Sequence, residues 1–392
     1  MIPRYKVQEI HDIWKTDNKL ETWLKVELAH LDSLMASITD KTLTESEYND
    51  IVENVFINKD RWIEIERETH HDVQAFVQML EETVPNNSGR WIHYGLTSSD
   101  ILDTSLSLMC KESINVIITY CGQALYTLNK ILKSDRAKSR ILSRTHGRAA
   151  EVQTYYDIVY RWLSYLRKGY DALLEAKTKI SVGKMSGASG NYNFSGLQNE
   201  ANALRQLGLK PVVSSQIVSR QYYLDYFYGI LQIILAVEKI AYDIRIYSID
   251  GVNEMSEPFE LRQKGSSAMP HKKNPILTEN ICGLTRLFKS YFQTAVENCT
   301  TVLERDISHS ASERIIFKDS AHIACFTLKR LEKVFKGLNL HTELAEKHCL
   351  SMEQAISSQK KMHENIKEGV SRKESHDNQQ IKAVETLYLE TY

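Results

Sequence analysis

The sequence predicts an all-α protein built from long helices. Its 392 residues include only 6 prolines and 16 glycines, and a β-rich fold needs many such residues at its turns. Apolar side chains recur in steps of three and four over long stretches, which is the spacing of one face of an α-helix. No convincing run of alternating apolar and polar residues competes with this pattern.

Five stretches carry the helical spacing. They cover residues 114–132, 152–166, 224–248, 276–297 and 312–337. A helix of about 25 residues is about 37 Å long, so several of them side by side form an elongated bundle. The run 226–231 is apolar on nearly every side, and a helix of that kind is buried all round. This favours association of subunits over a single large monomeric core.

The composition excludes several classes of protein. Hydrophobic residues make up 42% and charged residues 25% of the chain, which is ordinary for a globular protein. With 49 basic and 50 acidic residues the net charge is −1, which argues against a nucleic-acid binder but allows a local basic pocket for a small anion. The six cysteines form no CxxC pair, so we expect reduced, mostly buried thiols. The N-terminus has no apolar signal core and no segment is long enough to span a bilayer, so we expect a cytoplasmic protein without a membrane partner.

Four loop-like segments hold most of the side chains with catalytic potential. They are residues 70–76, 91–103, 143–151 and 253–275. The last is aperiodic, and loops of that length in compact domains are usually functional. Histidines fall in these segments beside Asp, Ser, Thr or Gly. No HxH or HExxH spacing suggests zinc, and no nucleophile elbow, P-loop or dinucleotide-binding glycine pattern occurs, so we expect neither metal nor cofactor.

The most informative segment is Gly-Ser-Ser-Ala-Met-Pro-His-Lys-Lys-Asn-Pro at 265–275. Its glycine permits a left-handed backbone, and two hydroxyls and two lysines follow. Asn274 and Pro275 suit the N-cap and the first position of the next helix. A helix start with free amides and nearby lysines is a natural seat for a carboxylate. The segment therefore predicts a binding site for an acidic group.

This segment resembles the signature loop of the fumarase–aspartase superfamily, GSSxMPxKxNP, and with His271 it is closest to the adenylosuccinate lyase form. Four other loops match that family in the same order, at 69–73, 94–98, 144–147 and 305–310. The resemblance extends from Tyr5 to about Leu340.

The resemblance implies an all-α, three-domain fumarase/aspartase-type fold. An N-terminal helical domain would cover 1–98, and a central long-helix bundle domain, with the signature loop at 253–275, would cover 99–344 and form the core of a homotetramer. A C-terminal helical domain would cover 345–392. Family members usually carry a longer third domain, and this chain stops at Tyr392.

The implied activity is that of a carbon–nitrogen lyase of purine nucleotide biosynthesis. Such an enzyme eliminates fumarate from adenylosuccinate, giving AMP, and from succinylaminoimidazole carboxamide ribotide, giving AICAR. Argininosuccinate lyase, aspartase, fumarase and carboxymuconate cycloisomerase share the scaffold and remain alternatives, as does a catalytically silent scaffold protein. His271 and the pair His71–Asp72 favour the purine enzyme, and the presence of both His146 and Ser266 argues against silence.

The resemblance also assigns catalytic roles. Ser266 is the base that takes a proton from carbon, and His146 is the acid that protonates the leaving nitrogen. Glu279 pairs with the acid and favours its charged form, and His71 lies near the phosphate or the leaving nitrogen. A serine hydroxyl is a poor base, so the assignment requires an alkoxide stabilised away from water, with Lys272 and the helix start as contributors.

The remaining implied residues hold the substrate. The succinyl carboxylates would be bound by Thr97, Ser98, Gln216, Ser267, Lys272 and Asn274. The nucleotide phosphate and ribose would be bound by Arg4, Tyr5, Arg305, Ser310 and Arg314, since arginine offers a bidentate fork to phosphate. His70, Asp72 and His93 complete the set. In this superfamily each active site is assembled from loops of three subunits.

Overall fold

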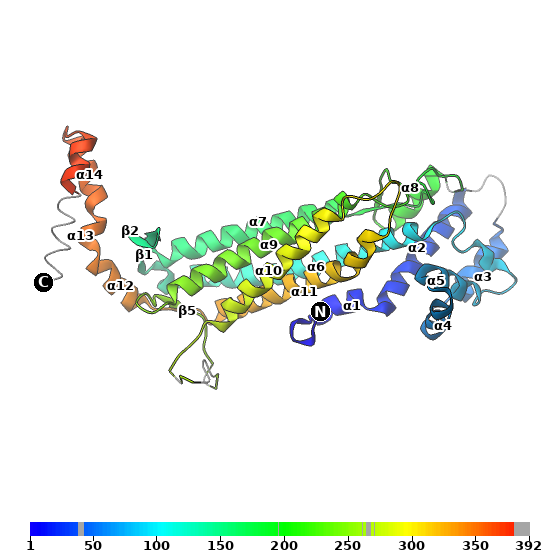
Figure 1. The fold of residues 1–392 in the computed structure, drawn as a ribbon, viewed down its shortest axis with the longest axis horizontal. Helices are drawn as coiled ribbons and strands as arrows, with labels where there is room; N and C mark the ends of the chain where they lie inside the picture. Colours follow the sequence, from blue (N-terminus) through cyan, green and yellow to red (C-terminus); the bar gives the residue numbers. More distant parts are fainter. Residues whose placement is uncertain (38–42, 195, 261, 264–267, 270, 380–392) are drawn as a thin grey trace. The chain divides into compact units, whose positions relative to one another are not determined.

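The computed structural model describes the chain apart from residues 38–42, 195, 261, 264–267, 270 and 380–392 (Figure 1). The described part contains fourteen α-helices, three short 3-10 helices and three two-stranded sheets. The predicted all-α fold is confirmed.

The elements fall into short N-terminal helices, long helices and a C-terminal group. The first group is η1 (Pro3–Tyr5), α1 (Gln8–Trp14), α2 (Thr16–Ser37), α3 (Glu45–Asn54), α4 (Lys59–Thr69), α5 (Asp72–Glu81) and η2 (Ser88–Trp91). The long helices are α6 (Ser98–Leu132), α7 (Tyr155–Lys179), α9 (Arg220–Tyr247), α10 (Ile276–Glu297) and α11 (Ser308–Lys336), with the shorter α8 (Leu197–Gln206) between α7 and α9. The last group is α12 (Thr342–Ser351), α13 (Glu353–Ile356) and α14 (Ser358–Lys367).

The short connections include η3 (Asp135–Lys138) and six strands. Strands β1 (Arg140–Thr145) and β2 (Arg148–Thr154) form an antiparallel hairpin. Strands β3 (Val182–Gly183) and β4 (Lys210–Pro211) pair in parallel, and β5 (Met255–Ser256) and β6 (Asn339–Leu340) pair antiparallel.

All five predicted long helices are present, with differences at their starts. Helix α10 has the predicted bounds, whereas α6 begins at Ser98 rather than near residue 114. The first turns of α6 bury small polar side chains, among them Ser99, Thr104 and Ser107, so they show no apolar periodicity. For the same reason the interpretation of 91–103 as a loop is wrong from Ser98 onward. The segment 70–76 is likewise helical from Asp72.

The hairpin is the main feature that the sequence did not predict. The sequence predicts a loop over 143–151 and a helix from 152, but these residues belong to β1 and β2 and the turn between them. Strand β1 carries a bulge between Leu142 and Arg144. A bulge shifts the side-chain alternation by one residue, and this hides the strand in the sequence.

The chain divides into two compact units. Unit 1 comprises Met1–Gln123, Leu166–Glu238 and Gly283–Lys329, and unit 2 comprises Ala124–Tyr165, Lys239–Cys282 and Arg330–Tyr392. Each of the five long helices therefore contributes residues to both units.

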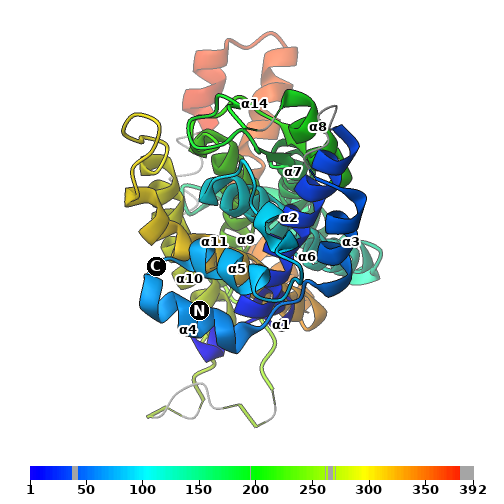
Figure 2. The same ribbon diagram turned by 90° about the vertical axis from the view of Figure 1, so that its right-hand side faces the viewer.

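Unit 1 contains the N-terminal helices and one part of each long helix (Figure 2). One apolar core joins α2 to α5, the start of α6, and α8, and includes the buried side chains of Trp23, Phe76 and Leu204. Helices α7 and α9 approach closely at glycines, because a Cβ at Gly169 would lie 2.7 Å from Ile233 Cδ1 and one at Gly229 only 2.6 Å from Ala176 Cβ. Larger residues at these two positions would separate the helices.

Unit 2 contains the hairpin, the other parts of the long helices and α12 to α14. Trp162 of α7 stacks on Phe335 of α11 with ring centroids 6.3 Å apart, and its Nε1 donates to Asp243 of α9 at 3.0 Å. Helix α12 packs on β1, with Ala345 and Cys349 fully buried. The hairpin thus has an apolar support on one side.

The cysteines agree with the expectation of reduced thiols. All six are free; five are buried and Cys299 is half-buried. In the described residues no helix is long and apolar enough to cross a membrane. Among the same residues, no three His, Cys, Asp or Glu side chains lie together in a way that could hold a metal ion.

Candidate active site

The Thr97–Ser98 turn begins α6 and is supported from below by buried charges. Asp100 accepts the Thr97 backbone N–H at 2.7 Å, which is half of a capping box. The other carboxylate oxygen of Asp100 pairs with Lys184 Nζ, and both side chains are 0% exposed. The Thr97 and Ser98 hydroxyls make no hydrogen bond within the described part of the chain. They are held in place and remain available to a ligand.

Gly95 shapes the same turn. Its φ is +75°, and a Cβ there would lie 3.1 Å from both Cβ and the carbonyl oxygen of Phe194. A side chain at this position would be strained by its backbone conformation and by the neighbouring segment. The backbone conformation and the close approach of Phe194 therefore explain why the predicted motif has a glycine at this position.

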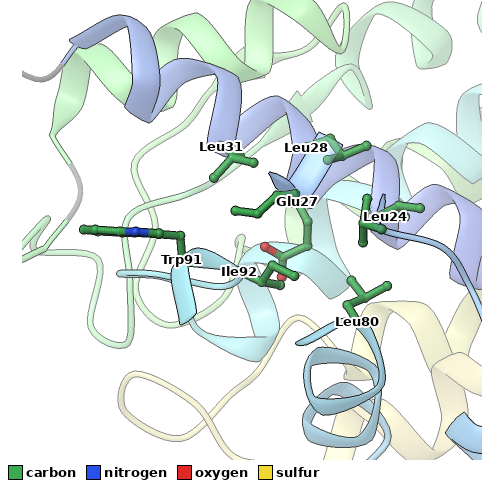
Figure 3. A pocket seen from close by; sticks show the side chains of 9 residues that line it. Leu24, Glu27, Leu28, Leu31, Leu80, Trp91 and Ile92 are labelled. Atoms are coloured by element: carbon green, nitrogen blue, oxygen red, sulfur yellow. The ribbon is translucent and has the colours of Figure 1, made fainter. Parts of the chain in front are cut away.

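His93 is tied to a buried carboxylate. Glu27, 4% exposed, accepts the His93 backbone N–H at 3.1 Å and its Nδ1 at 2.6 Å. Figure 3 shows this carboxylate among apolar side chains, including those of Leu24, Leu80 and Ile92. Burial alone would lower the pKa of His93, but the hydrogen bond and negative charge of Glu27 more than offset it, and the pKa is raised. The ring is therefore inclined to carry a positive charge.

The pair His70–His71 lies at the junction of α4 and α5. His71 is the N-cap of α5, and its Nδ1 accepts the Gln74 backbone N–H at 3.1 Å. This leaves the ring proton on Nε2, so an exposed neutral His71 offers a donor to a phosphate or a leaving nitrogen. The next residue, Asp72, lies 3.7 Å from Arg314 of α11. The structure thus brings two of the predicted substrate-binding segments together in unit 1.

A second pair of predicted residues meets in unit 1. Arg305 Nη1 donates to Gln216 Oε1 at 3.3 Å, although the two are 89 positions apart. Ser310 lies in the first turns of α11, where its neighbour His309 is buried and contacts Glu313 at 3.0 Å.

Arg4 and Tyr5 lie in η1, also in unit 1. Arg4 is exposed, and the Tyr5 ring packs edge-on against Phe326 at 5.0 Å. They contribute an exposed cation and a supported aromatic ring from the N-terminal segment.

The predicted acid, His146, stands at the tip of the hairpin in unit 2. It forms the two-residue turn with Gly147, and their φ values are 54° and 76°. Two positive φ values in succession define the tight turn that best matches the twist of a hairpin, where Asn-Gly is the common sequence. The His146 side chain is exposed. Its imidazole is presented outward by the backbone rather than enclosed by the rest of the chain.

Backbone strain coincides with the candidate histidines. Eight non-glycine residues of the described chain have positive φ, and three of them are His70, His93 and His146. Such conformations are uncommon for residues with a side chain and persist where the surrounding structure imposes them, often at functional sites. This supports the choice of these histidines independently of sequence motifs.

The signature loop is described at both of its ends. Ser266 and Ser267, the predicted base and one predicted carboxylate ligand, lie outside the described residues. Lys272 is exposed and Asn274 half-buried. Glu279 is exposed in the first turn of α10, and no hydrogen bond or ion pair of the described residues joins it to His146 of the same subunit.

The helix start after the loop differs from its predicted role. The amides of Leu277 and Thr278 both donate to the carboxylate of Glu257 at 2.9 Å. The helix start does bind a carboxylate, but this carboxylate is the side chain of Glu257, which is 6% exposed. The expectation that these amides receive a substrate carboxylate is therefore wrong. The side chains of the loop remain candidates for binding a substrate carboxylate.

Several supporting residues were missed by the sequence analysis. They are the buried charges Asp100, Lys184, Glu254 and Glu257. Asp100 had a signal, because Thr97-x-x-Asp100 is a capping-box pattern. The other three find their partners through tertiary contacts across 20 or more positions. No local spacing in the sequence predicts such contacts.

Comparison with known proteins shows the family of the chain. Residues 6–287 match the sequence model of a family described as Lyase. The adenylosuccinate lyase of Bacillus subtilis is 34% identical over 98% of this chain and 88% of its own, and that of Thermotoga maritima is 35% identical over 100% and 90%.

Solved structures show the same fold. A fumarate lyase from Mesorhizobium sp. BNC1 superposes with a TM-score of 0.87 at 18% identity, covering 100% of this chain and 89% of that one. The β-carboxy-cis,cis-muconate cycloisomerase of Acinetobacter calcoaceticus gives 0.82 at 17% identity, covering 98% and 88%. The chain therefore belongs to the lyase family and is an enzyme of that class. The relatives that it matches over nearly its whole length are adenylosuccinate lyases.

Proposed function

We propose that the chain catalyses the elimination of fumarate from adenylosuccinate, giving AMP, and from succinylaminoimidazole carboxamide ribotide, giving AICAR. The observation that carries this proposal is the 34–35% identity to two adenylosuccinate lyases along almost the full chain. The sequence contains the motif residues that this activity would use: His71–Asp72, Thr97–Ser98, His146 and the signature loop with His271.

The proposed chemistry is a general acid–base elimination. Ser266 takes the proton from the carbon beside one succinyl carboxylate, and the electron pair of that C–H bond forms the double bond of fumarate. The C–N bond breaks as His146 gives its proton to the leaving nitrogen. An exposed imidazole on a stiff turn is suited to reach a substrate outside its own subunit, and positioned acids of this kind contribute about 10²–10⁴-fold to a rate.

Substrate binding in the proposal uses the hydroxyls, amides and cations of the predicted site residues. The hydroxyls of Thr97 and Ser98 and the ammonium of Lys272 bind the succinyl carboxylates, with Gln216, Ser267 and Asn274 assisting. The cations Arg4, Arg305 and Arg314 bind the phosphate, with Tyr5 and Ser310. In the proposal, His71 donates a hydrogen bond from Nε2 to the substrate, and the ring of His93 contributes positive charge. His70 and Asp72 complete the set of substrate-binding residues.

We also propose that the enzyme is a homotetramer with active sites built from three subunits. Its domains would be 1–98, 99–344 and 345–392, the central one forming the tetramer core. Helix α9 supports this, because its residues Tyr228, Leu235 and Tyr242 recur every seven residues and are 49%, 42% and 39% exposed. A heptad stripe of exposed apolar side chains favours packing against another helix. Such packing would supply His146 with the Glu279 carboxylate that its own subunit does not provide.

Turnover by purified protein tests the activity. Adenylosuccinate, the ribotide and argininosuccinate are each incubated with the same preparation, and fumarate is measured against the second product. We expect equimolar fumarate and AMP, or fumarate and AICAR, and none from argininosuccinate. Release of fumarate from argininosuccinate alone would replace the proposal by that rival activity. No release from any of the three by tetrameric protein would contradict a lyase acting on these substrates.

A further inference from the structure

The buried carboxylate of Glu254 joins three parts of unit 2. It is 0% exposed and accepts both ends of the Arg144 guanidinium, from Nη1 at 2.6 Å and from Nη2 at 2.7 Å. Oε1 also contacts Nδ1 of His348 at 2.7 Å. A charged, bidentate pair of this kind is short and fixes the orientation of both side chains. Because a buried charge is costly to leave unpaired, the arrangement strongly resists rearrangement.

The backbone of Glu254 is held as firmly as its side chain. Its carbonyl accepts the hydroxyl of Tyr155 at 2.6 Å and the amide of His341 at 3.0 Å, and its own amide donates to Tyr247 at 2.9 Å. The next residue begins β5, which pairs with β6. Glu254, at the start of the signature loop, is therefore held by hydrogen bonds to α7, to α9 and to the segment before α12.

Arg144 connects Glu254 to the catalytic turn. It lies two residues before His146 on β1 and pairs across the hairpin with Ala149, and the next pair, Thr145 with Arg148, closes the turn. The hydrogen bond to Glu254 raises the pKa of Arg144, so the guanidinium stays charged. Other titratable neighbours are Tyr155 and Tyr247, whose pKa values burial raises, and Cys349, whose thiol pKa burial also raises.

We propose that Glu254 is a positioning residue for His146, acting through Arg144, and that His348 of α12 is part of the same support. This rests on the proposed function, in which His146 is the acid. The support lies between the hairpin and a helix of the C-terminal group, so α12 contributes to catalysis without touching substrate. Glu254 precedes the motif at 265–275, His348 lies outside all five matching loops, and neither is required to contact the reacting atoms.

A second ion pair between the same two elements offers a matched control. Arg140, at the opposite end of β1 from His146, pairs with Glu346 of α12 at 2.8 Å, and the two side chains are 41% and 39% exposed. An exposed pair of this kind contributes little to stability. Glu346→Gln therefore removes a charge from the same interface without disturbing the support of the turn.

The first measurement needs no substrate. Hydrogen–deuterium exchange is followed in wild type, Glu254→Gln, His348→Gln and Glu346→Gln, in the peptides that cover residues 143–151. We expect faster exchange in Glu254→Gln, a smaller increase in His348→Gln and wild-type exchange in Glu346→Gln. Unchanged exchange in Glu254→Gln would overturn the anchoring of the hairpin.

The second measurement separates positioning from general stability. For adenylosuccinate, we expect kcat of Glu254→Gln to fall about 10- to 100-fold, as small displacements of a catalytic group produce, while KM changes less than about threefold. Arg144→Lys keeps the positive charge but cannot form the bidentate pair with Glu254. We therefore expect its kcat to lie between those of wild type and Glu254→Gln.

The outcomes distinguish the two proposals. Faster exchange with an unchanged kcat would overturn the positioning role. Equal losses in Glu254→Gln and Glu346→Gln would also overturn it, because the effect would then belong to the interface as a whole. A wild-type protein without turnover would overturn the proposed function and with it the catalytic role, whereas the exchange result would still decide whether Glu254 anchors the turn.

Discussion

The Thr97–Ser98 turn of unit 1 and the His146 turn of unit 2 are built in opposite ways. The first lies on a fully buried ion pair, Asp100 with Lys184, and its backbone is capped by the same carboxylate. The second is the exposed tip of a hairpin, and its buried support, Glu254, pairs with Arg144 two residues before His146. The Thr97–Ser98 turn is thus fixed by buried contacts within the chain. The side chain of the proposed acid, His146, is exposed, and the buried ion pair that supports the turn lies two residues before it.

This difference suggests a division of labour. A site that binds a dianionic succinyl group benefits from donors that are rigid before the substrate arrives. In the proposal, His146 must reach the leaving nitrogen of the substrate and a carboxylate of another subunit. An exposed position at the tip of a hairpin allows this. The contrast predicts that changes beneath the first turn reduce stability, whereas changes at the second reduce turnover and leave the fold intact.

The largest effect is expected at the tip of the hairpin. Asparagine is favoured in this kind of turn, so His146→Asn removes the imidazole and retains the backbone. We expect kcat to fall about 10²–10⁴-fold, the contribution of a positioned acid, with an unchanged melting temperature. Steady-state kinetics and thermal unfolding of the same preparation check both halves. Near-normal turnover would remove His146 from its role.

The next largest effect is expected beneath the Thr97–Ser98 turn. Lys184→Met leaves Asp100 buried without its partner, which typically destabilises a protein by about 3–5 kcal/mol. We expect a correspondingly lower free energy of unfolding in denaturant. The control is Lys138→Met, since Lys138 is 75% exposed and its partner Asp135 96% exposed. A loss no larger than that of the control would contradict the account of unit 1.

A smaller and pH-dependent effect is expected at His93. Its pKa is raised in the folded state above the ordinary value of 6.5. The folded protein therefore binds the proton more tightly than the unfolded chain, so the stabilisation is complete below pH 6.5 and is lost as the pH rises through the raised value. His93→Gln should lower the free energy of unfolding by about 1.5–3 kcal/mol at acidic pH, the range for a hydrogen bond to a charged group. Denaturant titrations from acidic to alkaline pH should show this difference shrinking; a difference that grew with pH would reverse the sign of the argument.

The smallest effect is expected at the helix start after the signature loop. Glu257→Gln keeps the size of the side chain but removes the negative charge and one of the two acceptors that cap α10. Loss of a cap costs about 1 kcal/mol. Thermal unfolding should show a modest decrease, and an unchanged melting temperature would mean that Glu257 does not contribute as a cap.

The sequence was sufficient for the fold class and for the motif residues. Apolar periodicity located α7, α9, α10 and α11 because one face of each is buried, but it missed the start of α6, where most of the buried side chains are polar. The hairpin was missed because a bulge interrupts its alternation. The supports Lys184, Glu254 and His348 could not be predicted, because each depends on a partner that only the tertiary fold brings close.

The most direct test of the central claim combines two inactive variants. His146→Asn lacks the proposed acid, and Ser266→Ala lacks the proposed base. If the two side chains reach one site from different subunits, tetramers re-formed from a mixture contain some sites with both native residues. We predict that fumarate release from adenylosuccinate, absent in each variant alone, returns after the mixture is dissociated and reassembled. No recovery in verified mixed tetramers, or normal turnover by either variant alone, would contradict it.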